Sequence, residues 1–139
     1  MIGNKKSTHL ILQNKPPAVL AVCSGVSNIF DLAVWMGKTY LCAEKSLAPC
    51  DACKNCLTLD KNEHPDFKPL DTTSLENANI KVNDISILNG FFQLTSSQGG
   101  VRVFSMGLLE NVNATVQNTL LKTLEEPPEN LKLILFTMS

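Results

Sequence analysis

Three short, largely apolar runs divide the chain, at 18–23, 101–106 and 131–137. Prolines, glycines and serines lie at their ends, and the runs are too short for typical buried helices. Continuous apolar runs of this length are typical of strands buried on both faces of a parallel sheet. Cys23, in the first run, is therefore expected to be a small core residue. Residues 67–70 predict a further strand.

Between these runs, apolar residues recur at helical spacing. Residues 28–42 carry apolar side chains at every third or fourth position, and residues 113–126 do the same before two prolines stop the helix. Shorter helices are predicted at 7–14 and 84–92. Strands that alternate with helices predict an α/β fold with a parallel sheet and right-handed crossovers.

Four of the five cysteines lie close together, with the spacing C-x7-C-x2-C-x2-C. They are Cys42, Cys50, Cys53 and Cys56. Gaps of two residues let tight turns aim neighbouring sulfurs at one point, and four thiolates around Zn²⁺ form a closed tetrahedral site. Because a closed site leaves no coordination position open, the predicted zinc is structural. Residues 42–56 are thus predicted to be a zinc-binding insertion.

Other interpretations of these cysteines stay open. The last three fit the start of a ferredoxin-like iron–sulfur run, although the fourth Cys, followed by Pro, is missing. Two-residue gaps and the lack of a secretory context disfavour disulfides. Unligated thiols are also disfavoured, because such thiols are usually buried in cores, whereas these four lie in one polar loop. His64 is a further candidate ligand. We expect it in the turn before the next strand instead, since four cysteines already fill a tetrahedron.

Length and charge restrict the number of domains and the kinds of binding partner that the sequence favours. With 139 residues, 44% of them hydrophobic, the chain is large enough for one domain with a core. A net charge of −1 favours neither autonomous nucleic-acid binding nor attachment to a membrane surface. No apolar run approaches the ~20 residues of a membrane span, and Pro16 and Pro17 interrupt the signal-like start. We therefore expect a reduced, cytoplasmic protein without membrane contact.

The tripeptide Gly37-Lys38-Thr39 matches the end of the phosphate-binding pattern G-x-x-x-x-G-K-[ST], but its context is wrong. Leu32 replaces the first glycine, and the tripeptide lies deep in a predicted helix, where backbone amides cannot bind phosphate. The predicted strand-to-helix turn contains Gly25, Val26, Ser27 and Asn28. Because this turn holds one glycine and no lysine, we interpret it as a degenerate phosphate loop and expect no ATP binding.

Residues 118–128 read N-T-L-L-K-T-L-E-E-P-P. This stretch resembles the N-A-L-L-K-T-L-E-E-P-P signature of bacterial clamp-loader subunits and departs from it only at Thr119. The cysteine segment after the first long helix also matches that family. The H-P-D motif at 64–66 is more similar to the delta-prime subunits of DNA polymerase III than to the gamma/tau subunits. The resemblance implies that residues 1–139 form the N-terminal core of a AAA+ (P-loop NTPase-like) protein, ending before the lid and collar.

The family also places an acidic pair, Walker B, after the strand at 101–106. Counting back from the signature puts this pair at Gly107 and Leu108, and neither can hold Mg²⁺ or polarise a water. Gamma/tau subunits keep the phosphate loop and the acidic pair, whereas delta-prime subunits are typically degenerate in both. The resemblance therefore implies a scaffold subunit without catalytic residues or ATPase activity. Restoring Asp-Glu at this pair is expected to change neither clamp loading nor ATPase rate.

The implied partners are the gamma/tau ATPase subunits and the delta subunit of a bacterial DNA-directed DNA polymerase holoenzyme. The sliding clamp and primer-template DNA would be contacted only through the assembled complex. The family's arginine motif would lie past Ser139. Two alternatives stay open, an ATP-hydrolysing subunit of gamma/tau type and a small zinc-bearing interaction module. Nucleotide titration tests the first alternative, and a pull-down of partner subunits tests the second.

Overall fold

The computed structural model describes residues 17–23, 29–43, 49–72, 90–93, 100–112 and 114–138. Its strands are β1 (Ala18–Cys23), β2 (Phe67–Asp71), β3 (Arg102–Gly107) and β4 (Leu131–Met138). They form one sheet in the order β1-β4-β3-β2, and all neighbouring strands are parallel. The predicted parallel α/β fold is thus confirmed.

The helices are α2 (Ile29–Leu41), α3 (Lys54–Asp60) and α6 (Ala114–Glu125), with a short 3-10 helix η2 (Leu109–Asn111). The two long predicted helices are confirmed to within one residue at each end. The predicted helix at 7–14 lies outside the described residues, as does most of that at 84–92, of which 90–93 are helical. None of the helices in the described ranges is long and apolar enough to cross a membrane.

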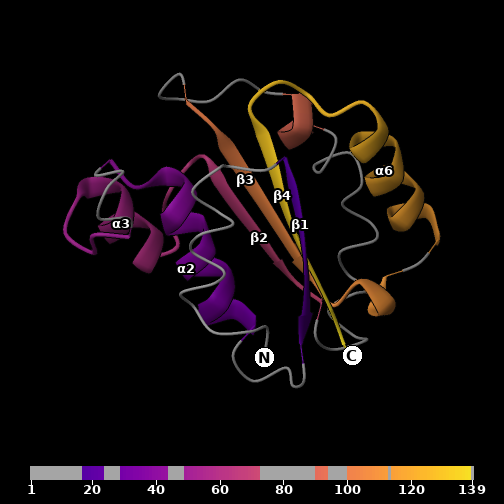
Figure 1. The fold of residues 1–139 in the computed structure, drawn as a ribbon, viewed down its shortest axis with the longest axis horizontal. Coiled ribbons are helices and arrows are strands. Elements are labelled where there is room, and N and C mark those ends of the chain that lie inside the picture. The colour runs from indigo at the N-terminus through magenta and orange to yellow at the C-terminus, as the bar shows by residue number, and fades with distance from the viewer. Residues whose placement is uncertain are drawn as a thin grey trace.

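Helices cover both faces of the sheet, with α2 and α3 on one side and α6 on the other (Figure 1). Alternate side chains of β4 follow this division, because Ile134 and Phe136 belong to the core on the α2 side, whereas Leu133 and Leu135 belong to that on the α6 side. All six residues of β3 are buried. A central strand with two covered faces explains the continuous apolar run in the sequence.

Strand β1 departs from the prediction of burial on both faces. Ala21 and Cys23 are buried on the α2 side, which confirms Cys23 as a core residue. Leu20 and Val22, which point the other way, are 59% and 46% exposed. The reason is the position of β1 at the edge of the four-stranded sheet, whereas the core under α6 is built mainly from β3 and β4.

Candidate metal centre

The four clustered cysteines converge on one point. The sulfur atoms of Cys42, Cys50, Cys53 and Cys56 all lie within 4.8 Å of one another, and those of Cys42 and Cys53 are 4.0 Å apart. A tetrahedral zinc ion with Zn–S bonds of ~2.3 Å requires its sulfurs to be about 3.8 Å apart. None of the five cysteines forms a disulfide. The four predicted ligands therefore have the spacing and chemistry to hold a metal ion.

A tight turn orients the side chains of Cys50 and Cys53. Asp51 adopts a left-handed conformation with φ 61°, and the backbone amides of Ala52 and Cys53 then donate to the Cys50 sulfur at 3.4 and 3.2 Å. Cys53 caps helix α3, since its sulfur accepts from the amide of Cys56 at 3.4 Å. Hydrogen bonds to sulfur favour the charged thiolate, which is the form that binds metal.

The environment changes the acidity of two of the thiols. Burial raises the pKa of Cys53, but hydrogen bonds from the backbone of Ala43 and Cys56 offset this effect, and the pKa falls to about 6. Burial raises the pKa of Cys56 to about 12, despite a hydrogen bond from the backbone of Asp51. Cys53 is therefore the thiol of this pair that ionises first, and a bound cation would favour the thiolate form of its neighbours.

A second set of polar contacts joins the cysteine segment to the body of the domain. The Asn55 side chain donates to the Leu41 carbonyl at the end of α2 at 2.7 Å and lies 3.0 Å from Nε2 of His64. Nδ1 of His64 accepts from the amide of Asp66 at 3.0 Å. This pattern requires a neutral ring with its proton on Nε2. His64 thus lies in the turn before β2, as expected.

We expect His64 to titrate below its ordinary pKa of ~6.5. Burial lowers the pKa, and the nearby Asp66 raises it only in part. The unfolded chain therefore binds a proton near pH 6.5 and the folded chain only at lower pH, so the free energy of unfolding falls as the pH drops below ~6.5. NMR titration of the ring C2 proton, assigned by its loss in His64→Gln, measures this pKa. A pKa of 6.5 or above would contradict the expectation.

The tripeptide that imitates a phosphate-binding motif lies inside α2, as the sequence predicts. A Cβ atom at Gly37 would lie only 2.7 Å from Cε1 of Phe67, so this glycine allows β2 to approach the helix closely. Thr39 donates its hydroxyl to the Trp35 carbonyl one turn earlier, at 3.1 Å. Both residues thus serve helix packing and geometry.

Lys38 has two carboxylate partners. Its Nζ lies 2.9 Å from Oδ1 of Asp51, which belongs to the cysteine turn, and 2.5 Å from Oδ1 of Asp60, at the end of α3. Burial lowers the pKa of Lys38, but the two carboxylates offset this effect and the pKa is raised overall. The ammonium group is therefore charged and is bound to the cysteine segment.

The predicted phosphate-loop residues at 25–28 lie outside the described residues, but the predicted Walker B pair is described. Gly107 ends β3, and a Cβ atom there would lie 2.7 Å from Cβ of Phe136 and 3.2 Å from Cγ2 of Ile29. Leu108 is 6% exposed. A longer side chain at either position would enter space that apolar groups already fill.

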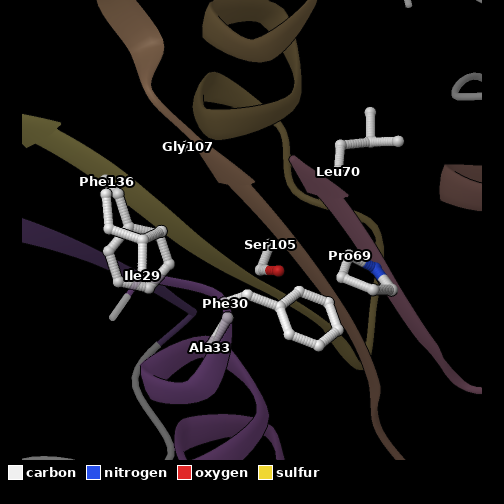
Figure 2. Close-up of a pocket in the computed structure, with 8 residues that line it drawn as sticks. All are labelled: Ile29, Phe30, Ala33, Pro69, Leu70, Ser105, Gly107 and Phe136. Atoms are coloured by element: carbon white, nitrogen blue, oxygen red, sulfur yellow. The ribbon is translucent and has the colours of Figure 1, made fainter. Parts of the chain in front are cut away.

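A small cavity of about 10 Å³ lies beside Gly107, between the sheet and the first turn of α2. Figure 2 shows that Phe30 extends from α2 toward Pro69 and that Ser105 is the polar side chain of the lining. The volume corresponds to roughly one water molecule. This part of the sheet end is thus packed with apolar groups.

Glu110 is the first carboxylate after β3, but its oxygens are engaged. Oε1 accepts from the Thr137 hydroxyl and Oε2 from the Met138 amide, both at 2.9 Å. Burial raises its pKa, but the hydrogen bonds to the carboxylate together outweigh this effect and the pKa is lowered. Glu110 therefore joins η2 to the end of β4.

Sequence reasoning missed three features of this region. It described the cysteine segment as a polar loop, whereas Cys56 lies on helix α3. It also gave no role to Lys38 or Asn55. The signal for α3 was weak, because a helix of seven residues shows almost no periodicity. The charges of Asp51 and Asp60 do complement Lys38, but the sequence does not show that they meet.

The family model and the related proteins that match this chain agree with one another. The family described as "DNA polymerase III, delta subunit" matches residues 6–139. DNA polymerase III subunit delta' of Bacillus subtilis is 29% identical over 107 residues, which cover 77% of this chain and 32% of the relative. The subunit delta' of Buchnera aphidicola from Acyrthosiphon pisum is 32% identical, over 89% of this chain and 35% of the relative. The chain thus spans about a third of the length of these two relatives.

A different subunit of the same polymerase also matches. DNA polymerase III subunit tau of Escherichia coli is 33% identical over 89 residues, which cover 64% of this chain and 13% of the relative. The chain is thus similar to delta' and tau subunits alike.

Proposed function

Because the chain belongs to the family of DNA polymerase III delta subunits, we propose that it is a non-catalytic clamp-loader subunit of the delta-prime type. It acts as a scaffold in the complex that loads the sliding clamp during DNA replication in the bacterial cytoplasm. Its partners are the gamma/tau ATPase subunits and the delta subunit, and it reaches the clamp and primer-template DNA through the assembled complex.

The observation that carries this proposal is the packing at Gly107. Ligands of open parallel sheets bind beyond the carboxyl ends of the strands, and P-loop ATPases hold Mg²⁺ there with an acidic residue. At the end of β3 a side chain would collide with Phe136 and lie tightly against Ile29, and the next residue, Leu108, is buried. This arrangement supports a subunit that has given up the metal-binding carboxylate and, with it, ATP hydrolysis.

The rest of the domain supports a scaffold role. The sheet carries a packed core on each face, which supports a rigid platform. Helix α6, which carries most of the clamp-loader signature, packs on this sheet through Val116 and Leu120. A subunit that does not pass through the nucleotide cycle provides a fixed surface against which ATP-driven neighbours can move.

We also propose that Cys42, Cys50, Cys53 and Cys56 bind one structural Zn²⁺. The sulfur separations fit a tetrahedral four-thiolate site, which leaves no position open for catalysis. The cysteine sulfurs form a small cluster of their own beside the larger cores. When bound, the ion joins the end of α2, the turn at Asp51 and the start of α3.

Reconstitution of the clamp loader with full-length protein tests the proposed function. We expect clamp loading to be lost when this subunit is left out, because the complex lacks one fixed neighbour. The purified subunit alone should hydrolyse no ATP above background. Loading at full rate without the subunit would refute the scaffold role. Hydrolysis by the subunit itself would support the gamma/tau alternative, and failure to bind any clamp-loader subunit would support the small interaction module.

A further inference from the structure

Lys38 contacts the cysteine segment at two points. Its backbone carbonyl accepts a hydrogen bond from the amide of Cys42 at 2.7 Å, and its ammonium group binds Asp51 at 2.9 Å. Asp51 directly follows Cys50 and shapes the turn that leads to Cys53. The first contact is the last hydrogen bond of helix α2, and the second links this end of the helix to the turn between Cys50 and Cys53.

The same ammonium group binds Asp60 at 2.5 Å, so it also holds the end of helix α3, which carries Cys56. The side chain of Lys38 is 10% exposed, whereas those of Asp51 and Asp60 are 65% and 50% exposed. The cation is therefore the buried member of this group. Helix α2 fixes its position, and the two carboxylates come to it from the cysteine segment and from the end of α3.

We propose that Lys38 is a positioning residue of the metal centre: it holds the Asp51 turn so that the sulfurs of Cys50 and Cys53 face that of Cys42. The ammonium group also offsets part of the negative charge of Asp51 and Asp60, to which it is bound. A zinc ion with four thiolates leaves about two negative charges in excess, and Asp51 and Asp60 add to them. This role depends on the metal binding proposed above. It also gives Lys38, the lysine of the tripeptide that resembles a phosphate-binding motif, a role that does not involve phosphate.

Zinc affinity of the full chain, measured by competition with a chromophoric chelator, tests the role of Lys38. We expect Lys38→Met to weaken zinc binding by roughly 10-fold or more, as is typical when a residue that orients metal ligands is removed. Lys38→Arg keeps the charge and should recover part of the affinity. Lys54→Met is the matched control, because it removes an exposed lysine directly after Cys53. It should change the affinity less than about threefold, since exposed charges interact weakly.

A double-mutant cycle shows whether Lys38 acts through Asp51. Asp51→Asn removes the ion pair but tolerates the left-handed backbone, and it should weaken zinc binding in the same direction. If the two residues act together, the double variant should lose less than the product of the single losses. Asp51→Asn compared with Lys54→Met also tests the proposal should Lys38→Met fail to fold.

The outcomes separate the two proposals. Wild-type chain that binds no zinc would overturn the zinc site itself. Wild-type chain that binds zinc, with Lys38→Met no weaker than Lys54→Met, would leave the zinc site standing and overturn the role of Lys38. Independent losses in the cycle would likewise refute action through Asp51. The Co²⁺-substituted wild type should show the absorption bands of a tetrahedral thiolate site, which confirms that the competition reports this centre.

Discussion

Replacement of Cys53 by serine should abolish zinc binding while the parallel sheet stays folded. The Cys53 sulfur lies 4.0 Å from that of Cys42 and also caps helix α3, so its loss removes one of four ligands and a helix cap. We expect the zinc content to fall from about one ion per chain to less than about a tenth. Elemental analysis of the purified variant measures the change, and far-UV circular dichroism follows the sheet.

The sheet should survive because its cores do not depend on the cysteines. The two large clusters contain β1, β3 and β4 residues, whereas the four cysteines form a separate cluster. In small zinc fingers, by contrast, metal binding supplies most of the folding free energy. Cys23→Ala is the matched control, because this buried cysteine lies outside the metal cluster and its loss should leave the zinc content unchanged. Iron in the wild-type protein, or freely titratable thiols without metal, would contradict the zinc assignment.

Replacement of Gly107 by alanine should destabilise the protein, although the change adds a single methyl group. That methyl group would lie 2.7 Å from Cβ of Phe136, so the strand or the aromatic side chain must move. Overpacking of this kind costs about 1–3 kcal/mol. Gly90→Ala is the matched control, because no atom of the described residues outside its own helix backbone and chain neighbours lies within 4 Å of the added methyl group, and residue 90 is helical. It should leave the free energy of unfolding unchanged or raise it by up to ~1 kcal/mol.

The same packing adds an effect on stability to one expectation from the sequence. Restoring Asp-Glu at Gly107 and Leu108 was expected to change neither clamp loading nor ATPase rate, because the phosphate loop is degenerate. The structure adds a steric reason for a larger effect, since the aspartate would meet Phe136 and Ile29 and would carry a charge into an apolar region. We therefore expect this double variant to unfold at lower denaturant concentration than Gly107→Ala. Equal or greater stability than wild type would contradict the packing argument.

The sequence predicted the sheet well because its strands are short, apolar and separated by two long amphipathic helices. It predicted from spacing alone that four cysteines converge to bind zinc; the structure confirms that they converge, and metal binding stays a prediction. Spacing suffices here because two-residue gaps restrict where the sulfurs can point. The features that the sequence did not predict depend on how the elements are arranged in space. The exposure of Leu20 and Val22 depends on β1 lying at the sheet edge, and apolar composition does not report strand order.

The contacts of Lys38 were missed for a related reason. Asp51 and Asp60 lie 13 and 22 residues away in the chain, and only the folded cysteine segment brings them to one ammonium group. The pattern G-K-T resembles the end of a phosphate-binding motif and does not indicate these ion pairs. The phosphate-binding interpretation was rejected because of the position of the tripeptide in a helix, which the structure supports, whereas the ion pairs of the lysine depend on tertiary contacts.

The tripeptide Gly37-Lys38-Thr39 also has a consequence for mutagenesis. In a working phosphate loop these residues serve one common ligand. Here each residue contacts a different neighbour: Gly37 lies against the ring of Phe67, Lys38 binds two carboxylates, and Thr39 donates to a carbonyl of its own helix. Substitution of one of the three therefore disturbs one set of contacts and leaves the other two in place.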